Sequence, residues 1–329
     1  MRLRARQHRR NGFVLVVVLG LVLLLSVLLF GFNHKTLIRL DTAESFREFE
    51  QALHCARAGL GIAMAAIRDA NDLSDNPRFA KLRTGQETFS VGDGTCSVTI
   101  TGADGRLNVN RLKSRGGRLD RRRIEQLLRL IDLINRDRVG SEHIGYSLVP
   151  ALIDWIDQDD EITQLPFVNR DNQGAENRYY ATLTPAYPCR NRPMDTIEEL
   201  YWVKGVTPEA FAILRDLLTT VGEGRININT APRLVIECLS EQMDPVLTQV
   251  IIQQREVKPF RHVAELKEVP GMTDNVYETI RDTITTGSDE QHYRVSTRGK
   301  VGDRICEIEA LLRRNSKAGN VDIIQYRES

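Results

Sequence analysis

The residues best suited to chemistry form an acidic run in the middle of the chain. The stretch 152–161 holds five carboxylates within eight residues and no basic side chain. Crowded carboxylates repel one another, and a hard cation such as Ca²⁺, which takes about six to eight oxygen ligands, relieves that repulsion. The spacing Asp157-x-Asp159-x-Glu161 is that of the start of an EF-hand loop, but Ile162 stands where that loop requires glycine, which excludes an EF-hand proper. A solvated acidic helix end is the alternative interpretation.

No pattern of catalytic residues accompanies the acidic run. The sequence contains no GxSxG, GxxxxGK[ST] or HExxH motif, and its six histidines are scattered. The five cysteines form no CxxC pair, so a zinc site is not expected. Their odd number means that at least one is free or bonded to another chain, and the sequence does not assign pairs. We therefore expect that the protein is not an enzyme.

A membrane-spanning segment lies close to the N-terminus. Residues 13–32 carry no ionisable side chain, and the short leader before them holds five arginines. About 20 apolar residues suffice to cross a bilayer as one helix. Since the arginines lie on one side only, the N-terminus is expected in the cytoplasm and the rest of the chain is expected to be exported.

The junction between leader and span is more specific than the span itself. A basic leader, Gly12, Phe13 and an uninterrupted apolar helix resemble the class III signal of type IV prepilins and pseudopilins. The resemblance implies that a prepilin peptidase cuts after Gly12 and methylates the new N-terminal residue, Phe13. An uncleaved signal anchor is the alternative.

One position departs from the usual prepilin pattern. The fifth mature residue of most such proteins is glutamate, whereas this chain has Val17. A carboxylate in hydrocarbon is costly unless it is paired, and its partner in pilins is thought to be the N-terminal amine of a neighbouring subunit. A subunit without this glutamate cannot bind the N-terminal amine of a neighbouring subunit in one direction along the filament. Such a subunit suits a filament end. Among pseudopilins this absence resembles the minor pseudopilin K of type II secretion.

The remaining pattern predicts an α+β fold. A helix of nearly 60 residues, partly in the membrane, is expected to pack on a small antiparallel pilin-like sheet, with hairpin-rich segments at 88–101 and 292–326. A large all-α region is inserted into the sheet, as two modules similar to SAM or helix-hairpin-helix units. The predicted domains are the leader 1–12, the transmembrane segment 13–32, the periplasmic helix 33–75, the sheet domain 76–111 with 287–329, and the inserted modules 112–222 and 223–286.

Local patterns mark the helix starts and the module openings. Residues 195–198 have capping-box spacing, and Thr207-Pro208 and Asp244-Pro245 each place a capping side chain before a proline. The segment 105–110, with sequence GRLNVN, recurs at 224–229 as GRININ. We interpret this echo as the opening of two successive helical modules.

The inserted region strengthens the family resemblance. The acidic LxDWxDxDD segment, followed by 174–180, 185–188 and 191–194, resembles the inserted α-domain of the type II secretion K pseudopilins. That resemblance implies structural calcium in this domain. By position we carry the ligands onto Asp157, Asp159, Glu161 and Glu176, with Asp160 or Asn172 as possible substitutes.

A second resemblance favours a different function. The stretches 200–208 and 266–273 are similar to helix-hairpin-helix units, and 227–232 is similar to membrane-anchored competence DNA receptors. In both hairpins the second glycine, which a phosphate-binding backbone requires, is replaced by threonine, at Thr207 and Thr273. The formal net charge is only +1, so nucleic acid is not the expected partner.

Together the patterns predict a minor pseudopilin of the type II secretion system. The resemblance implies that it initiates or caps the tip of the periplasmic pseudopilus with the minor pseudopilins I and J, and that the prepilin peptidase processes it. It places the chain as a single-pass protein of the inner membrane with a periplasmic C-terminal domain. The alternative is a membrane-anchored DNA receptor of competence type.

Overall fold

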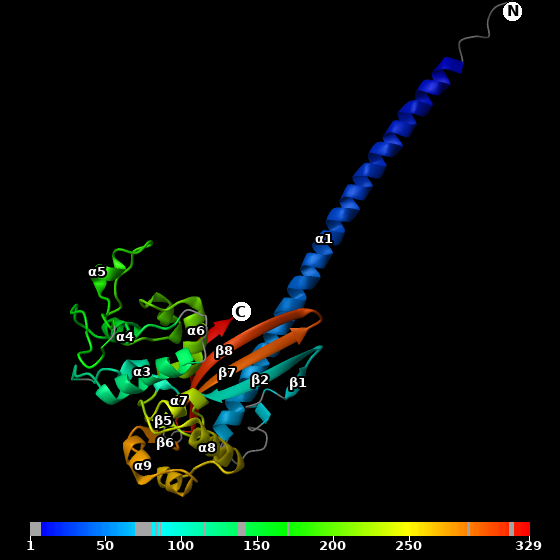
Figure 1. Ribbon diagram of the computed structural model, residues 1–329. Coiled ribbons are helices and arrows are strands. Elements are labelled where there is room, and N and C mark those ends of the chain that lie inside the picture. Colours follow the sequence, from blue (N-terminus) through cyan, green and yellow to red (C-terminus); the bar gives the residue numbers. More distant parts are fainter. Residues whose placement is uncertain are drawn as a thin grey trace, which may run out of the picture.

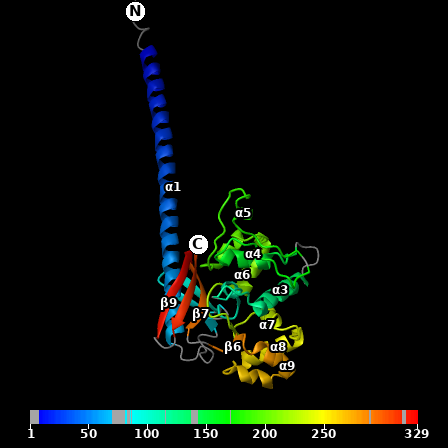
Figure 2. The same cartoon turned by 90° about the vertical axis from the view of Figure 1, so that its left-hand side faces the viewer.

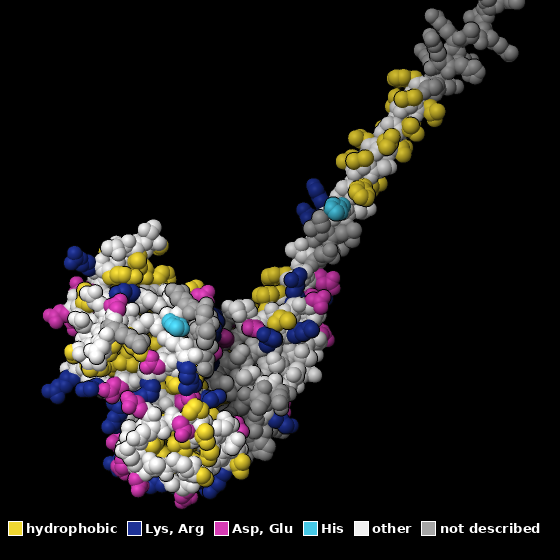
Figure 3. Space-filling view, viewed as in Figure 1, with side chains coloured by type: hydrophobic (Ala, Val, Ile, Leu, Met, Phe, Trp, Pro, Cys, Tyr) yellow, Lys and Arg dark blue, Asp and Glu magenta, His cyan; other side chains and the backbone are white. Residues whose placement is uncertain are grey.

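A long helix is the stem of the molecule. The computed structural model describes residues 8–69, 81–82, 85, 87–114, 116–136, 143–169, 171–287, 290–315 and 319–329. Helix α1 (His8–Asp69) has 62 residues, a length of about 93 Å, and its first half stands clear of the head (Figure 1). Within the described part of the chain, one helical stretch, Phe13–Thr36, is long and apolar enough to cross a membrane. Figure 3 shows its hydrophobic side chains along the stem.

The described part of the stem covers most of the predicted helix. The periplasmic helix was predicted over 33–75, and α1 is described as far as Asp69. Residues 70–75 lie outside the described part of the chain, as does most of the predicted leader. The structure therefore describes the helix on both sides of the Gly12–Phe13 junction.

The second half of α1 packs on one antiparallel sheet of five strands. In spatial order the strands are β1 (Thr88–Val91), β2 (Gly94–Gly102), β7 (Glu290–Val301), β8 (Arg304–Asn315) and β9 (Asn320–Glu328). The helix comes so close that a Cβ atom at Gly299 would lie 2.0 Å from the carbonyl oxygen of Ala52. Only glycine fits this contact, which brings the backbones together over a buried apolar layer. The predicted α+β fold is confirmed.

The insert lies between β2 and β7 along the chain. It was predicted to be all-α and is mainly helical, although its described residues include four short strands. Its first part contains β3 (Leu107–Asn108), η1 (Val109–Arg111), α3 (Arg121–Arg136), α4 (Leu148–Ile156), α5 (Asn177–Tyr180), η2 (Ile197–Trp202), α6 (Pro208–Leu217) and β4 (Leu218–Thr219). Its second part contains β5 (Ile226–Asn227), α7 (Arg233–Glu237), α8 (Pro245–Val257), η3 (Val263–Glu268), α9 (Asp274–Ile280) and β6 (Ile284–Thr285). Short parallel pairs, β3 with β4 and β5 with β6, join the start of each part to its end.

These pairs correct one predicted boundary. The sheet domain was predicted to continue to residue 111, but β2 ends at Gly102. Leu107 and Val109 belong to the hydrophobic core of the insert. The insert therefore begins directly after the strand, because its first residues are needed to pair with its last.

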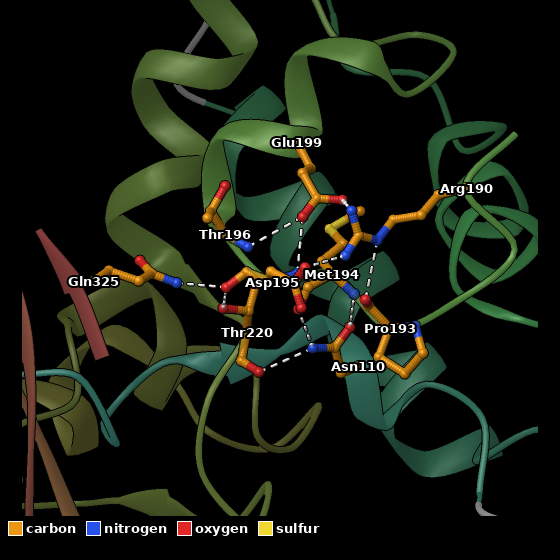
Figure 4. A network of polar contacts seen from close by, with 9 residues as sticks. All are labelled: Asn110, Arg190, Pro193, Met194, Asp195, Thr196, Glu199, Thr220 and Gln325. Carbon is orange, nitrogen blue, oxygen red and sulfur yellow. Dashed lines mark hydrogen bonds and ion pairs between the residues drawn. The ribbon is translucent and has the colours of Figure 1, made fainter. Parts of the chain in front are cut away.

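An asparagine closes the first module. The Asn110 side-chain amide donates to the carbonyl oxygens of Met194 and Thr220, each at 2.9 Å, and its Oδ1 accepts from the Met194 N–H at 2.8 Å (Figure 4). One polar side chain thus satisfies three backbone groups from two distant segments. Such a contact locks the end of the module onto its beginning.

The second module repeats this arrangement. The Asn229 side-chain amide donates to the carbonyl oxygens of Phe260 and Thr286, at 2.8 and 3.2 Å, and its Oδ1 accepts from the Phe260 N–H at 2.9 Å. The sequence echo of 105–110 and 224–229 is therefore the sealing segment of two structurally repeated modules.

The insert packs on the face of the sheet opposite to α1. Along β8 alternate residues are buried under the helix, and between them Glu309 faces the insert and contacts Arg215 of α6 at 3.4 Å. Arg327 of β9 joins Glu309, at 2.6 Å, to Glu198 of η2, at 3.9 Å. Figure 2 shows the resulting order of stem, sheet and insert. The bulk of the protein thus extends sideways from the stem.

Candidate metal centre

The acidic centre is built on the C-terminal end of α4. All nine residues of this helix are buried, Asp154 among them, and Asp157 is its C-cap residue. Asp154 and Asp157 are three positions apart, so both carboxylates lie on one side of the last turn. A helix C-terminus carries partial negative charge, which disfavours carboxylates and favours a cation.

A third acid reaches this point from farther along the chain. Carboxylate oxygens of Asp157, Asp159 and Glu176 all lie within 4.8 Å of one another. Glu176 is the N-cap residue of α5 and is only 2% exposed. The loop after α4 and the start of α5 therefore converge on one small volume.

Several of these oxygens are buried without a partner. Among the described residues, neither carboxylate oxygen of Glu176 has a hydrogen-bond partner, nor has Oδ2 of Asp154 or Oδ1 of Asp157. The Cys189 thiol, a weak donor, lies beside Glu176. Burying a carboxylate without a hydrogen bond or a counterion costs several kcal/mol. Oxygen atoms directed at a common point are what a hard cation requires.

Burial and mutual repulsion perturb the acids strongly. The pKa of Glu176 is raised from 4.5 to about 8, first by burial and then by the charges of Asp154, Asp157 and Asp160. Burial also raises the pKa of Asp154 to about 6. A pKa this high means that Glu176 keeps its proton at neutral pH when no cation is present.

One basic side chain already contacts the cluster. Lys113 Nζ lies 2.7 Å from Oδ2 of Asp157 and 3.2 Å from Oδ2 of Asp159. No local sequence pattern points to Lys113, because it lies far from the acidic run along the chain.

A glycine allows the loop to close over Asp154. The Thr163 N–H donates to Oδ1 of Asp154 at 2.9 Å, and the Gly174 N–H donates to the Thr163 carbonyl at 3.0 Å. A Cβ atom at Gly174 would lie 2.1 Å from Oδ2 of Asp154. The predicted family segment beginning at Gly174 is thus part of the centre.

Three of the predicted ligands do not join the cluster of oxygens. Asp160 accepts from the Asn177 side-chain amide at 2.8 Å, and Asn172 uses its Oδ1 to accept from the Leu165 N–H at 2.9 Å. Glu161 is exposed, and only its backbone N–H contacts the centre, through Oδ1 of Asp159. Asp154, which was not among the predicted ligands, lies beside the cluster, where its charge raises the pKa of Glu176, and its spacing from Asp157 on α4 was the available signal.

The remaining predicted positions belong to α1 and to the hairpins. Phe13 and Val17 lie exposed within the apolar stretch of α1. The hydroxyls of Thr207 and Thr273 accept from backbone N–H groups at the starts of α6 and α9. Both threonines therefore act as helix caps, as proposed for Thr207. This use favours helix packing over phosphate binding at the hairpins.

The capping box lies one residue later than predicted. The Glu199 carboxylate accepts from the N–H groups of Asp195 and Thr196, at 2.8 and 3.1 Å, and it pairs with Arg190 at 2.7 Å (Figure 4). The box thus spans 196–199 instead of 195–198. It anchors the segment that follows the acidic loop.

Comparisons with known proteins agree on one family. Two family descriptions, both reading "Type II secretion system (T2SS), protein K", match residues 105–223 and 226–286, and together these ranges span more than half of the chain. Type II secretion system protein K of Pseudomonas aeruginosa is 25% identical over 327 residues, covering 96% of this chain and 92% of the relative. The protein of the same name from Klebsiella pneumoniae is 25% identical over 274 residues, covering 80% and 81%.

A solved structure shares the fold. It is a chain of the GspK-GspI-GspJ complex from the type 2 secretion system of enterotoxigenic Escherichia coli. The two chains superpose with a TM-score of 0.66 at 18% identity, covering 88% of this chain and 99% of that one.

The perturbed acids predict a pH dependence of the metal-free protein. Between about pH 5 and pH 8, folded Glu176 keeps a proton that the unfolded chain has lost. The folded state then binds more protons, so the free energy of unfolding falls as pH rises, by roughly 2–4 kcal/mol. Urea unfolding of the detergent-solubilised chain in a chelator, followed by circular dichroism, measures this slope. Glu176→Gln is expected to flatten the slope and Glu161→Gln to leave it unchanged; an undiminished slope in Glu176→Gln would contradict the assignment.

Proposed function

The chain belongs to the protein K family of the type II secretion system and is a minor pseudopilin; from this premise we propose that it initiates or caps the tip of the pseudopilus. The observation that carries the proposal is the position of the insert. It projects from the sheet face opposite to the stem (Figure 2). Stems stacked side by side along a filament would force such inserts to collide, whereas at the end no further subunit lies beyond.

The stem supports the same location. Val17 stands at the position where the resemblance to pilins expects glutamate. Without a carboxylate there, α1 lacks one of the two contacts that a subunit within a filament makes through its N-terminal region. An end subunit needs only one.

We propose the minor pseudopilins I and J as partners, since the similar structure is a complex with GspI and GspJ. The purified full chain should form a stable complex with both when mixed in detergent, detected by size-exclusion chromatography with light scattering. The major pseudopilin serves as the matched control and should not replace them. Binding to neither I nor J, or copies of the chain found all along the pseudopilus, would contradict the tip assignment.

We also propose processing at the Gly12–Phe13 junction, followed by methylation of Phe13. The processed chain would lie in the inner membrane as a single-pass protein, with its N-terminus in the cytoplasm and its head in the periplasm. The arginine-rich leader and the apolar stretch Phe13–Thr36 support this orientation. The role proposed for it is assembly, without catalysis.

Replacing the residue before the cut tests the processing. Gly12→Val is expected to leave an unprocessed precursor, because a branched side chain would obstruct the peptidase at the scissile bond. Gly20→Val, in the same apolar helix with open space around it, is the matched control and should be processed normally. Mass spectrometry of the membrane fraction distinguishes the two forms, and cleavage of Gly12→Val at the wild-type rate would refute the site.

We propose that the acidic centre holds a structural Ca²⁺. Asp157, Asp159 and Glu176 would supply the principal ligands, with Asp154 beside them. The donors are all hard oxygens, and the partnerless buried atoms of Glu176 and Asp154 fit such a cation. When bound, the ion would neutralise the charges that otherwise force protonation of Glu176.

Chelation should therefore destabilise the protein. With calcium about a hundredfold above its Kd, the melting temperature is expected to exceed that in a chelator by roughly 5–10 °C. Asp157→Asn should abolish this difference, while the exposed neighbour Glu161 provides the control, since Glu161→Gln should retain it. Differential scanning calorimetry makes the comparison, and a melting temperature unaffected by calcium would count against the site.

A further inference from the structure

Lys113 occupies the acidic centre in the way an internal counterion does. Its side chain is mostly buried, and Nζ contacts one oxygen of Asp157 and one of Asp159. Both carboxylates belong to the cluster proposed to hold calcium. The lysine and the metal would therefore use the same two residues.

The backbone holds Lys113 at this place. The Asp120 N–H donates to the Leu112 carbonyl at 2.8 Å, and Lys113 forms an isolated antiparallel bridge with Leu119. Just before it, Asn108 and Asn110 fasten the chain to the end of the module. The ammonium group is thus presented to the acids by a constrained segment, not by a free tail.

One positive charge does not balance the centre. The ammonium group pairs with Asp157 and Asp159, which leaves both oxygens of Glu176 and Oδ2 of Asp154 without a hydrogen-bond partner among the described residues. A divalent cation placed among Asp157, Asp159 and Glu176 would neutralise more of this charge. However, an ammonium group and a Ca²⁺ ion that contact the same carboxylates repel each other across a few ångströms. The two cations therefore exclude each other at Asp157 and Asp159.

A cleft beside the cluster has room for the Lys113 side chain when it leaves the two carboxylates. Lys113, Asp157 and Asp159 line a cleft of about 680 Å³ that is also bordered by Ser114 and Gly117. A flexible four-carbon side chain can rotate into this space without unfolding of the segment that carries it.

We propose that Lys113 is a tethered competitor of calcium, which holds Asp157 and Asp159 when the metal is scarce and is displaced when the metal binds. This inference rests on the calcium site proposed above. It assigns Lys113 the role of setting the calcium concentration at which the centre fills. The metal-free insert would then keep its acidic loop in place through the lysine, and the loaded insert through the ion.

Isothermal titration of Ca²⁺ into the chelator-treated full chain in detergent tests the inference. Lys113→Met keeps the length of the side chain and removes its charge, so the variant should bind calcium about tenfold more tightly than the wild type. Lys113→Arg, which keeps the charge, should not gain affinity.

Lys204 provides the matched control. Its Nζ donates to the carbonyl oxygens of Gln173 and Gly174, at 3.1 and 3.2 Å, beside the centre but on backbone groups. Lys204→Met removes a nearby positive charge without freeing an acid of the cluster, so it should change the affinity less than Lys113→Met.

A second measurement separates competition from damage to the fold. In chelator, Lys113→Met should melt at a lower temperature than the wild type, because Asp157 and Asp159 have lost the ammonium group that neutralises them. Saturating calcium should restore the wild-type melting temperature. Equal or weaker calcium binding by Lys113→Met than by the wild type would overturn the competitor role and leave the calcium site standing. If neither the wild type nor any variant binds calcium, both the competitor role of Lys113 and the calcium site are wrong. The tip function is tested separately, by the formation of a complex with pseudopilins I and J.

Discussion

The structure depends on a closure constraint where the insert leaves and re-enters the sheet. Gly102 at the end of β2 is paired with Tyr293 in β7, so the whole insert must begin and end at one point. Asp104 and His292 lie at this point: Oδ2 of Asp104 accepts from the His292 N–H at 2.7 Å, and its Oδ1 lies 2.9 Å from the imidazole Nδ1. Within each module, the short parallel strand pair and the asparagine contacts likewise hold the end of the segment next to its start. Because every segment returns to its origin, the insert can be large and leave the register of the sheet intact.

The acidic centre lies in the first module because this module contains a segment that the second module lacks. Both modules share the sealing asparagine, the 3-10 helix and the capped helix after it, but the first also includes α4, α5 and the acidic loop between them. Leu165 and Ala175 of that loop are buried in the core of the insert, while its acids Asp157 and Asp159 meet Glu176 near the end of α4. Burying such charges is costly unless they are neutralised, so the loop depends on counter-charge as well as on apolar packing. Lys113 supplies part of that neutralisation from the opening of the same module.

The stem and the insert pack on opposite faces of the sheet through different kinds of contact. On one face α1 packs through small residues and a close backbone contact at Gly299, which joins the stem to the head. On the other face the contact includes arginine–glutamate pairs between sheet and insert, Arg215 with Glu309 and Arg327 with Glu198. A rigid stem with a bulky lateral domain is suited to the end of an assembly, since the domain needs free space beyond the last subunit.

Features that depend on adjacent residues were predictable from local sequence patterns. The apolar stem, the hairpin strands and the capping threonine and aspartate before Pro208 and Pro245 were all predictable, because each depends on a few consecutive residues. The acidic run identified the place of the candidate centre and two of its three clustered acids by their spacing, and the third, Glu176, by resemblance alone. Only the tertiary structure placed Glu161 outside the cluster of oxygens, brought Asp154 and Lys113 beside it, and moved the start of the insert to the residue after Gly102. These outcomes depend on which distant segments meet when the modules close, and local sequence patterns carry no information about such contacts.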